Sequence, residues 1–277
     1  MILASTIELG IPVFHEAEKR IIVKEVLPEE FHLHVLAAAT NQYVVPLYPC
    51  SHWRLLVMPR KEGDLFDYLC NNPMMGSQAR IQIISQVCDA LARLPDDFIY
   101  FDIKLENVLY DHDAGGNLCI YLTDFGRGTT LLFSPIETFR GQSASPKTMS
   151  YALGLMAFVF LHGVYPFPQL QEMDLEGTLM RNRYQVKQLL SHRIDTAEIA
   201  TKFQVYHEEY QFYYPVIDIC LQQDATRRPS CNVVSQMWAT AKLQEDNFKF
   251  QRTNCITACL GQYCPNDVID ITLNCLN

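Results

Sequence analysis

The segment YFDIKLENVLYD, residues 100–111, constrains the fold of this chain more than any other part of the sequence. It places Asp102, Lys104 and Asn107 close together between two apolar flanks. A charge that is held beside a hydrophobic core without a partner is unfavourable by several kcal/mol. The fold therefore has to bring these three side chains to partners or to a ligand.

Two short β-rich segments in this region predict a hairpin. They are NVLYD (107–111) and CIYLTDFG (119–126), and the turn-forming sequence HDAGGN joins them. Antiparallel pairing of the segments would bring Asn107 close to Asp124. An amide oxygen and a carboxylate held side by side suit magnesium, which binds one or two carboxylates together with substrate phosphates. The sequence thus predicts a magnesium ion that is bound with a nucleotide.

The first 60 residues are expected to form a small β-rich lobe that contains one helix. Three segments have the composition typical of strands, at 20–26, 43–50 and 53–59. Between the first two, residues 28–40 begin with a proline and carry apolar residues at helical spacing. We therefore predict one helix set among three strands.

The chain changes to helical periodicity after the segment PRKEG (59–63), which we interpret as a hinge. From Asp64 onward, apolar residues recur every three or four positions, a spacing typical of amphipathic helices. The lobe boundaries follow from this change: residues 1–60 form the small lobe, and residues 61–245 form a helical lobe that contains the hairpin. Residues 246–277 are a separate, Cys-bearing tail in this division.

A buried helix is expected at YALGLMAFVFLHG (151–163), which is shorter than the roughly 18 residues needed to span a bilayer. The first residues, MILASTIELG, lack the basic region of a secretory signal. The net charge of −9 argues against the phosphate backbone of nucleic acids as a partner. We therefore expect a protein of the cytoplasm or nucleus, a reducing compartment, with neither membrane nor nucleic acid as partner.

The chain has ten cysteines, and those that lie in or beside apolar segments are expected to be free thiols. The tail differs, because it carries Cys255, Cys259, Cys264 and Cys275. A zinc site with four thiolates is one alternative, but the short spacing usual in such sites is missing. Ordinary thiols or a redox pair are favoured over zinc.

The polar residues of the hairpin region resemble the catalytic and metal-binding loops of the eukaryotic protein kinase family. YFDIKLEN stands where that family has His-Arg-Asp-Leu-Lys-x-x-Asn, and TDFG matches its metal-binding loop. By this resemblance, Asp102 would accept the proton of the substrate hydroxyl, and Lys104 would steady the transferred phosphoryl group. Asn107 and Asp124 would hold Mg²⁺. The implied fold is α+β and bilobal, with a shortened β-rich N-lobe and a helical C-lobe.

The resemblance extends to the nucleotide site. IIVK resembles the third strand of the family's small lobe, so Lys24 would bind the α- and β-phosphates of ATP. Met58 stands at the family's gatekeeper position. The carbonyl of Pro59 and the amide of Lys61 would face adenine, where the missing N–H of proline is not needed. Asp64 would lie near the ribose, or would instead cap the helix that follows.

The phosphate-binding loop departs from the family pattern. The family has three glycines before a valine there; if Val13 is that valine, Gly10 is the only glycine nearby, and Glu8 would repel ATP. The Glu that normally pairs with the Lys of the third strand is also displaced, because the expected position falls on His32. The sequence leaves three possibilities for the partner of Lys24: Glu30, Glu29 or none.

Further departures concern regulation and support of the catalytic loop. Tyr100 and Phe101 replace the family's His and Arg, so control by phosphorylation of the activation loop is not expected. The segment 124–137 is about half the usual length, which leaves peptide docking open. Met149 replaces the Asp that opens the long buried helix, so a hydrogen bond to the catalytic loop is expected to be missing.

Two later segments match the large lobe of the family. SPIE places Glu137 where the family has the Glu of Ala-Pro-Glu, and CLQQDATRRPS provides its expected partner, Arg228. The resemblance implies a buried ion pair between them. The hinge phrase LVMPRKEGDLFDYL is similar to serine/threonine kinases carried by large DNA viruses, such as herpesviruses.

The resemblance implies a divergent serine/threonine protein kinase that uses ATP and Mg²⁺ and acts on a protein substrate. The alternative is a pseudokinase or decoy, a binding module that regulates a partner kinase without catalysis. The polar residues of the cleft favour the kinase, whereas the degraded glycine loop and the short activation segment favour the binding module. The sequence identifies neither the protein substrate nor the oligomeric state.

Overall fold

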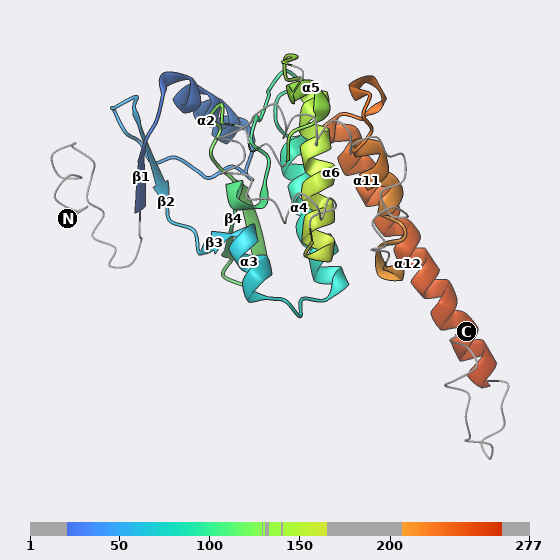
Figure 1. The fold of residues 1–277 in the computed structure, drawn as a ribbon. Helices are drawn as coiled ribbons and strands as arrows, with labels where there is room; N and C mark the ends of the chain where they lie inside the picture. Colours follow the sequence, from blue (N-terminus) through green and yellow to red (C-terminus); the bar gives the residue numbers. More distant parts are fainter. Residues whose placement is uncertain (1–20, 129, 131–132, 140, 165–206, 262–277) are drawn as a thin grey trace.

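The computed structural model describes residues 21–128, 130, 133–139, 141–164 and 207–261. Within these residues the chain forms a small lobe with a two-stranded sheet and one helix, and a larger lobe that is mostly helical (Figure 1). Among the described helices, none is long and apolar enough to cross a membrane.

The small lobe contains β1 (Ile21–Glu25), α2 (Pro28–Thr40) and β2 (Leu55–Pro59). The two strands pair antiparallel, with Lys24 opposite Leu56. Helix α2 begins at the predicted residue because Pro28 has the φ angle of a first helical turn and lacks only an N–H that would be unpaired there. The helix predicted at 28–40 is therefore confirmed.

The strand predicted at 43–50 is wrong. The structure has only an isolated parallel bridge there, between Val44 and Leu122. Pro46 and Pro49 have no N–H to donate, so this segment cannot form a continuous ladder. The segment instead meets the end of β5, where the Val45 N–H donates to the carbonyl of Leu122 at 3.0 Å. Just before it, Asn41, the C-cap of α2, donates its side-chain N–H to the carbonyl of Ala90 at 2.8 Å and so ties the helix to the large lobe.

The predicted hairpin is confirmed. Strands β4 (Val108–His112) and β5 (Leu118–Leu122) pair antiparallel, and the short β3 (Gly63–Asp64) joins them at the β4 edge. In the turn, the Asp113 carboxylate accepts the backbone N–H groups of Gly115 and Asn117, each at 2.8 Å. Gly116 has a φ of 78°, which favours glycine. This local chemistry fixes the register that positions the residues before and after the hairpin.

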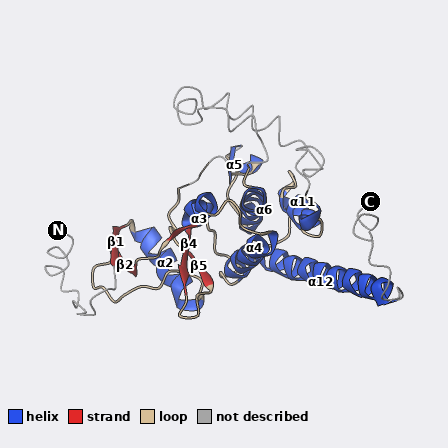
Figure 2. Cartoon of the chain, turned by 90° about the horizontal axis from the view of Figure 1, so that it is seen from below, coloured by secondary structure: helices blue, strands red, loops and turns tan. Residues whose placement is uncertain are grey.

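The large lobe is built around the buried helix α6 (Pro146–His162). Figure 2 shows α4 (Ser77–Ala92) and α11 (Tyr214–Cys220) beside it, and each contacts it. Two shorter helices, α3 (Leu65–Asn71) and α5 (Ile136–Phe139), lie nearer the hairpin and the segment after it. The buried helix predicted at 151–163 is thus confirmed, although it begins five residues earlier at Pro146.

The last described helix, α12 (Cys231–Gly261), runs without a break across the predicted boundary between residues 245 and 246. Glu245 anchors it in the body of the lobe: its carboxylate is buried and accepts hydrogen bonds from Tyr213 at 2.7 Å and Gln78 at 2.6 Å. Phe248 still contacts Phe212, with ring centres 5.7 Å apart, and the C-terminal part of α12 then extends away from the lobe (Figure 1). The division into three domains stays a prediction.

The cysteines whose side chains are described are all free thiols, as expected: Cys50, Cys70, Cys88, Cys119, Cys220 and Cys231. Burial raises the pKa of the Cys231 thiol to about 12 and also raises that of Cys88. These thiols are therefore protonated and act as small apolar side chains. The side chains of the four tail cysteines lie outside the described part of the chain, so the alternatives for the tail stay open.

A histidine at the end of α6 makes the stability of the large lobe depend on pH. Burial, and then the neighbouring His207 and Arg80, lower the pKa of His162 to about 4. A pKa below the unfolded value of about 6.5 stabilises the fold at neutral pH, and this contribution is lost as the pH falls from about 6.5 towards 4. We expect His162→Gln to lose less stability than the wild type between pH 7 and pH 4.5, as measured by urea unfolding. Identical pH slopes for the two proteins would contradict this assignment.

Candidate functional site

The small lobe contributes an ion pair that faces the large lobe. Lys24 Nζ lies 2.6 Å from Glu30 Oε1 and 3.1 Å from Asp124 Oδ1. Burial alone would lower the pKa of Lys24, but the hydrogen bond that Lys24 donates to Glu30 and the charge of Asp124 raise it above its ordinary value. Lys24 is therefore fully charged. Of the three possibilities that the sequence left for its partner, the structure has Glu30.

The neighbouring acid, Glu29, has a different partner. Its carboxylate lies 2.8 Å from Nε of Arg127, and both side chains are exposed. Glu30 can approach the segment after the hairpin because residue 126 is glycine: a Cβ at Gly126 would lie 3.2 Å from Glu30 Oε2 and 3.3 Å from Asp124 Oδ1. The glycine thus leaves room for two carboxylates on either side of one ammonium group.

The catalytic-loop residues are partners of one another. Oδ2 of Asp102 lies 3.0 Å from Nζ of Lys104 and accepts the Asn107 side-chain N–H at 3.2 Å. The same amide donates to the Asp102 carbonyl at 2.8 Å. These contacts explain how the three polar groups of this segment are held between apolar flanks, since each charge has an opposite charge or a donor beside it.

Thr130 completes this cluster and was not identified from the sequence. Its backbone N–H donates to Oδ1 of Asp102 at 2.6 Å, and its hydroxyl accepts a hydrogen bond from Lys104 at 2.9 Å. Thr130 lies 28 residues after Asp102 in a segment of irregular structure. Local sequence carries no signal for such a contact, because it depends on the path of the chain after the hairpin.

The two predicted magnesium ligands lie at the open end of the hairpin. The backbone carbonyl of Asn107 accepts the Thr123 N–H at 3.1 Å, so the residue before β4 is next to the one that precedes Asp124. Asp124 has a φ of 58°, in the left-handed region, and its side chain is 47% exposed. A carboxylate and an amide oxygen are the hard ligands that magnesium prefers.

Within the described residues, no cluster of three or more His, Cys, Asp or Glu side chains forms a complete metal site. A magnesium ion bound by Asn107 and Asp124 would therefore need further oxygen ligands. Mg²⁺ usually takes these from substrate phosphates and water. The donor set thus fits a cation that arrives with a nucleotide better than a permanently bound metal.

Three aromatic rings connect α2 to the catalytic loop. The ring of Phe125 lies 5.2 Å from that of His34 and 4.8 Å from that of Tyr100. His34 is fully buried, and its Nε2–H donates to the carbonyl of Val45 at 2.9 Å. Burial also lowers its pKa, so this histidine is neutral. The rings couple the helix that carries Glu30 to the residue next to Asp124.

The hydrogen bond between α6 and the catalytic loop, which was expected to be missing because Met149 replaces an Asp, has a weak substitute. The backbone N–H of Tyr100 donates to the Met149 sulfur at 3.5 Å, and the Tyr100 hydroxyl donates to the carbonyls of Thr123 and Asn107. A thioether is a weak acceptor. A contact between α6 and the catalytic loop is therefore present, but a sulfur atom makes it in place of a carboxylate.

The predicted adenine-facing residues lie where the two lobes meet. Met58 is buried in a small apolar cluster, and Leu109 and Tyr121 of the hairpin pack against this cluster. Pro59 is the last residue of β2. The side chain of Lys61 is turned towards the hairpin, where its Nζ lies 3.2 Å from Oδ2 of Asp111.

Two other nucleotide-site residues have different outcomes. The carboxylate of Asp64 accepts the backbone N–H of Asp67 at 2.9 Å, so the helix-capping alternative is confirmed. Val13, together with Gly10 and Glu8, lies outside the described residues. The predicted departure of the phosphate-binding loop from the family pattern therefore stays a prediction.

A cavity of about 270 Å³ adjoins Asp102. Its walls come from the catalytic loop, from the segment after Thr130 and from the start of α6. Phe101, which stands where an arginine was expected from the resemblance, lines this cavity.

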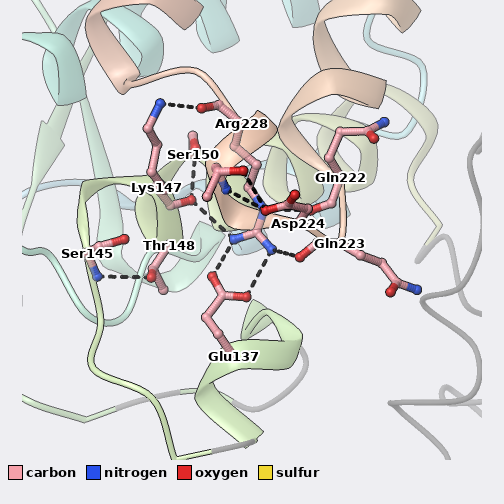
Figure 3. A network of polar contacts seen from close by, with 10 residues as sticks. Glu137, Ser145, Lys147, Thr148, Ser150, Gln222, Gln223, Asp224 and Arg228 are labelled. Carbon is pink, nitrogen blue, oxygen red and sulfur yellow. Dashed lines mark hydrogen bonds and ion pairs between the residues drawn. The ribbon is translucent and has the colours of Figure 1, made fainter.

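The predicted pair between Glu137 and Arg228 is confirmed and is buried (Figure 3). The Arg228 side chain has no exposed surface, and its guanidinium binds the carboxylate through both terminal nitrogens, with Nη2 at 2.9 Å from Oε2. The same group donates to the carbonyls of Gln222 at 2.6 Å and Gln223 at 2.9 Å. This network fixes the end of the segment that contains Thr130 to the helical lobe.

The sequence matches known proteins over most of its length. The family model described as "Protein kinase domain" matches residues 14–239. The chain is 30% identical over 174 residues to Serine/threonine-protein kinase 1 of Orgyia pseudotsugata multicapsid polyhedrosis virus, an alignment that covers 57% of this chain and 62% of that protein. The protein of the same name from Heliothis zea nuclear polyhedrosis virus is 28% identical over 188 residues, with 61% and 68% covered. The chain thus spans about three fifths of the Orgyia virus protein.

Two solved structures share the fold. The Cydia pomonella granulovirus kinase PK-1 has a TM-score of 0.57 and 20% identity, over 79% of this chain and 85% of that one. The Rad53 kinase domain, solved with AMPPNP, has the same score and identity, over 81% and 83%. At this identity the likeness shows the fold alone. The predicted bilobal α+β architecture is therefore confirmed, and the similarity to viral kinases agrees with the resemblance noted in the hinge sequence.

Proposed function

Because the chain belongs to the protein kinase family, we propose that it is a serine/threonine kinase, which transfers the γ-phosphate of ATP to a hydroxyl of a protein substrate. One observation carries the proposal: Lys24, paired with Glu30, lies 3.1 Å from Asp124, while Lys104 and Asn107 both contact Asp102. Phosphoryl transfer depends mainly on alignment and on neutralisation of charge, and this set of charges supplies both.

Each residue has a distinct role in this proposal. Asp102 would accept the proton of the Ser or Thr hydroxyl, and Lys104, which lies 3.0 Å from it, would steady the transferred phosphoryl group. Lys24 would bind the α- and β-phosphates. Asn107 and Asp124 would hold Mg²⁺, which when bound neutralises the charge of the phosphates.

The base and ribose would lie at the junction of the lobes. Met58, the carbonyl of Pro59 and the amide of Lys61 would contact adenine, and Asp64 would lie near the ribose while it caps α3. Val13 would cover the nucleotide from the small lobe. The apolar cluster that Met58 forms with its neighbours supports this placement, because it makes the junction of the lobes apolar, as sites for flat rings usually are.

A pseudokinase or decoy is the second candidate, and the short segment between Asp124 and Glu137 favours it. Measurements of partner binding and of phosphate transfer would distinguish it from an active kinase. Such a protein would bind a partner kinase, with or without Mg-ATP, and would transfer no phosphate. The complete set of charged groups in the cleft favours the active kinase, because a chain without chemistry has no physical need to hold them there.

Binding of Mg-ATP provides the first test of the proposal. At a hundredfold excess over Kd, Mg-ATP is expected to raise the Tm of the wild type by about 5 °C. Asp124→Asn, which keeps the shape but removes the charge, is expected to lose most of this shift. Lys242→Met, far away on α12, is the control and should keep it. A wild-type Tm that does not respond to millimolar Mg-ATP would contradict nucleotide binding.

The proposed partner is a protein with a Ser or Thr acceptor. The proposed place of action is the cytoplasm or nucleus, in a host cell for a viral protein. The free thiols among the described cysteines support a reducing compartment. The acidic composition supports a partner other than nucleic acid.

A further inference from the structure

The side chain of Lys61 is buried under the connection between the lobes, although it carries a charge. It is only 9% exposed. Its Nζ lies 3.2 Å from Oδ2 of Asp111 and 3.5 Å from the centre of the Tyr121 ring. An ammonium group over the face of a tyrosine ring is attracted by the ring electrons, and this attraction grows as water is removed. Two groups from two different strands therefore hold the one lysine.

Both groups lie on the face of the hairpin that is turned to the small lobe. Leu109 pairs with Tyr121 across the hairpin, and Asp111 lies two residues further along β4. Side chains two residues apart on a strand point to the same face, so Leu109, Asp111 and Tyr121 share one face. Leu109 and Tyr121 also pack against the cluster that contains Met58. Lys61 is thus fastened to the surface that the adenine ring would contact.

Glu62, the residue after Lys61, also contacts the hairpin, but its side chain does so at the exposed surface. The backbone N–H of Glu62 donates to the carbonyl of Tyr110 at 3.1 Å, and its carboxylate lies 2.9 Å from Nδ1 of His112. Both of these side chains are substantially exposed, so their pairing is weak. Lys61 therefore provides the buried attachment of this part of the hinge to the large lobe.

We propose that the side chain of Lys61 is a positioning residue for the nucleotide base. By binding Asp111 and the ring of Tyr121, it fixes the direction in which the Pro59 carbonyl and the Lys61 amide point. Hydrogen bonds to a purine edge need donors and acceptors at fixed positions, and a small displacement weakens them strongly. This inference rests on the proposed nucleotide binding and adds a residue that sets affinity and selectivity for the base.

If Lys61 positions the base, its replacement should change the KM for ATP but leave the kcat for phosphate transfer nearly unchanged. Lys61→Met keeps the length of the side chain but loses its charge, so the KM for ATP is expected to rise about tenfold. The kcat should stay within about twofold, because Lys61 lies away from Asp102 and Asp124. The preference for ATP over GTP should also fall. Lys61→Arg keeps the charge and the contact with the ring, so it should restore most of the affinity.

Three further variants sharpen the test. Lys242→Met makes the same replacement at a lysine on α12 that binds Gln82 at 2.8 Å, and it should leave both constants unchanged. Tyr121→Leu removes the ring under Lys61 and should raise the KM in the same direction as Lys61→Met. Asp111→Asn should raise the KM in the same direction as Lys61→Met, and it provides the measurement if Lys61→Met does not fold.

The possible results separate this inference from the function on which it rests. A wild type that binds no Mg-ATP would overturn both. A wild type that binds Mg-ATP, with the same KM and base preference in Lys61→Met and Asp111→Asn, would overturn only the role of Lys61. A loss that appears equally in kcat and in thermal stability, and that Lys61→Arg does not rescue, would also overturn it, because that result indicates a purely structural lysine.

Discussion

Replacement of Asp102 by Asn is expected to lower the kcat for phosphate transfer by about 10²–10⁴-fold, the range typical of a positioned general base. Asn has the shape of Asp and can still accept the N–H of Thr130, but its amide NH₂ would then face the donors Lys104 and Asn107, so retention of Mg-ATP binding has to be measured alongside. It cannot take up the proton of an acceptor hydroxyl. The measurement is transfer of labelled phosphate from ATP to peptides that carry Ser, Thr or Tyr, with wild type and variant side by side.

Binding of Mg-ATP serves as the control for this experiment. Asp102→Asn should keep the thermal shift of the wild type, because Lys24, Asn107 and Asp124 are unchanged. Transfer by the variant at the wild-type rate would show that Asp102 is not the base. A wild type that binds Mg-ATP but labels neither itself nor any peptide would favour the pseudokinase.

Replacement of Arg228 by Leu is expected to lower the free energy of unfolding by about 3–5 kcal/mol. The change leaves the Glu137 carboxylate buried without its partner, and it also removes the donors that bind the carbonyls of Gln222 and Gln223. An unpaired charge in a buried site costs more than the pair contributes. Urea unfolding of the wild type and the variant measures the difference.

A second variant and a control keep this prediction testable. Glu137→Leu combined with Arg228→Leu should recover part of the loss, since no charge then stays buried alone. Arg228→Lys keeps the charge but lacks the planar fork, so an intermediate loss is expected. Lys242→Met, at the surface, should change stability by no more than about 0.5 kcal/mol. A loss below about 1 kcal/mol in Arg228→Leu would mean that the pair does not hold the lobe together.

Local patterns predicted the elements whose chemistry is contained in a few neighbouring residues. Pro28 and the apolar spacing after it located α2, and the turn sequence between β4 and β5 located the hairpin. The apolar run of α6 indicated a buried helix because nearly every side chain on it is covered. The pair of Glu137 and Arg228 came instead from the resemblance, which carries long-range contacts that composition and periodicity do not.

What the sequence did not predict depends on the path of the chain in three dimensions. The choice between Glu29 and Glu30 follows from the direction in which α2 enters, and one residue on a helix rotates the side chain by about 100°. Residues 43–50 have strand composition, but Pro46 and Pro49 lack the N–H groups of a continuous ladder, so the segment forms an isolated bridge with the end of β5. The contacts of Thr130 and Lys61 join segments that are 28 and 50 residues apart.

The attachment of Asn41 to the carbonyl of Ala90 determines how α2 can move. The C-terminal end of this helix is fastened to the large lobe, so a swing that keeps this contact pivots there, and the opposite end travels furthest. Glu30 lies eleven residues from the pivot, or about 16 Å along the axis. A rotation of about 15° would displace its carboxylate by about 4 Å. A small turn of one helix is therefore enough to separate it from Lys24, and a partner that pushes on the first turn of α2 would act with the longest lever arm.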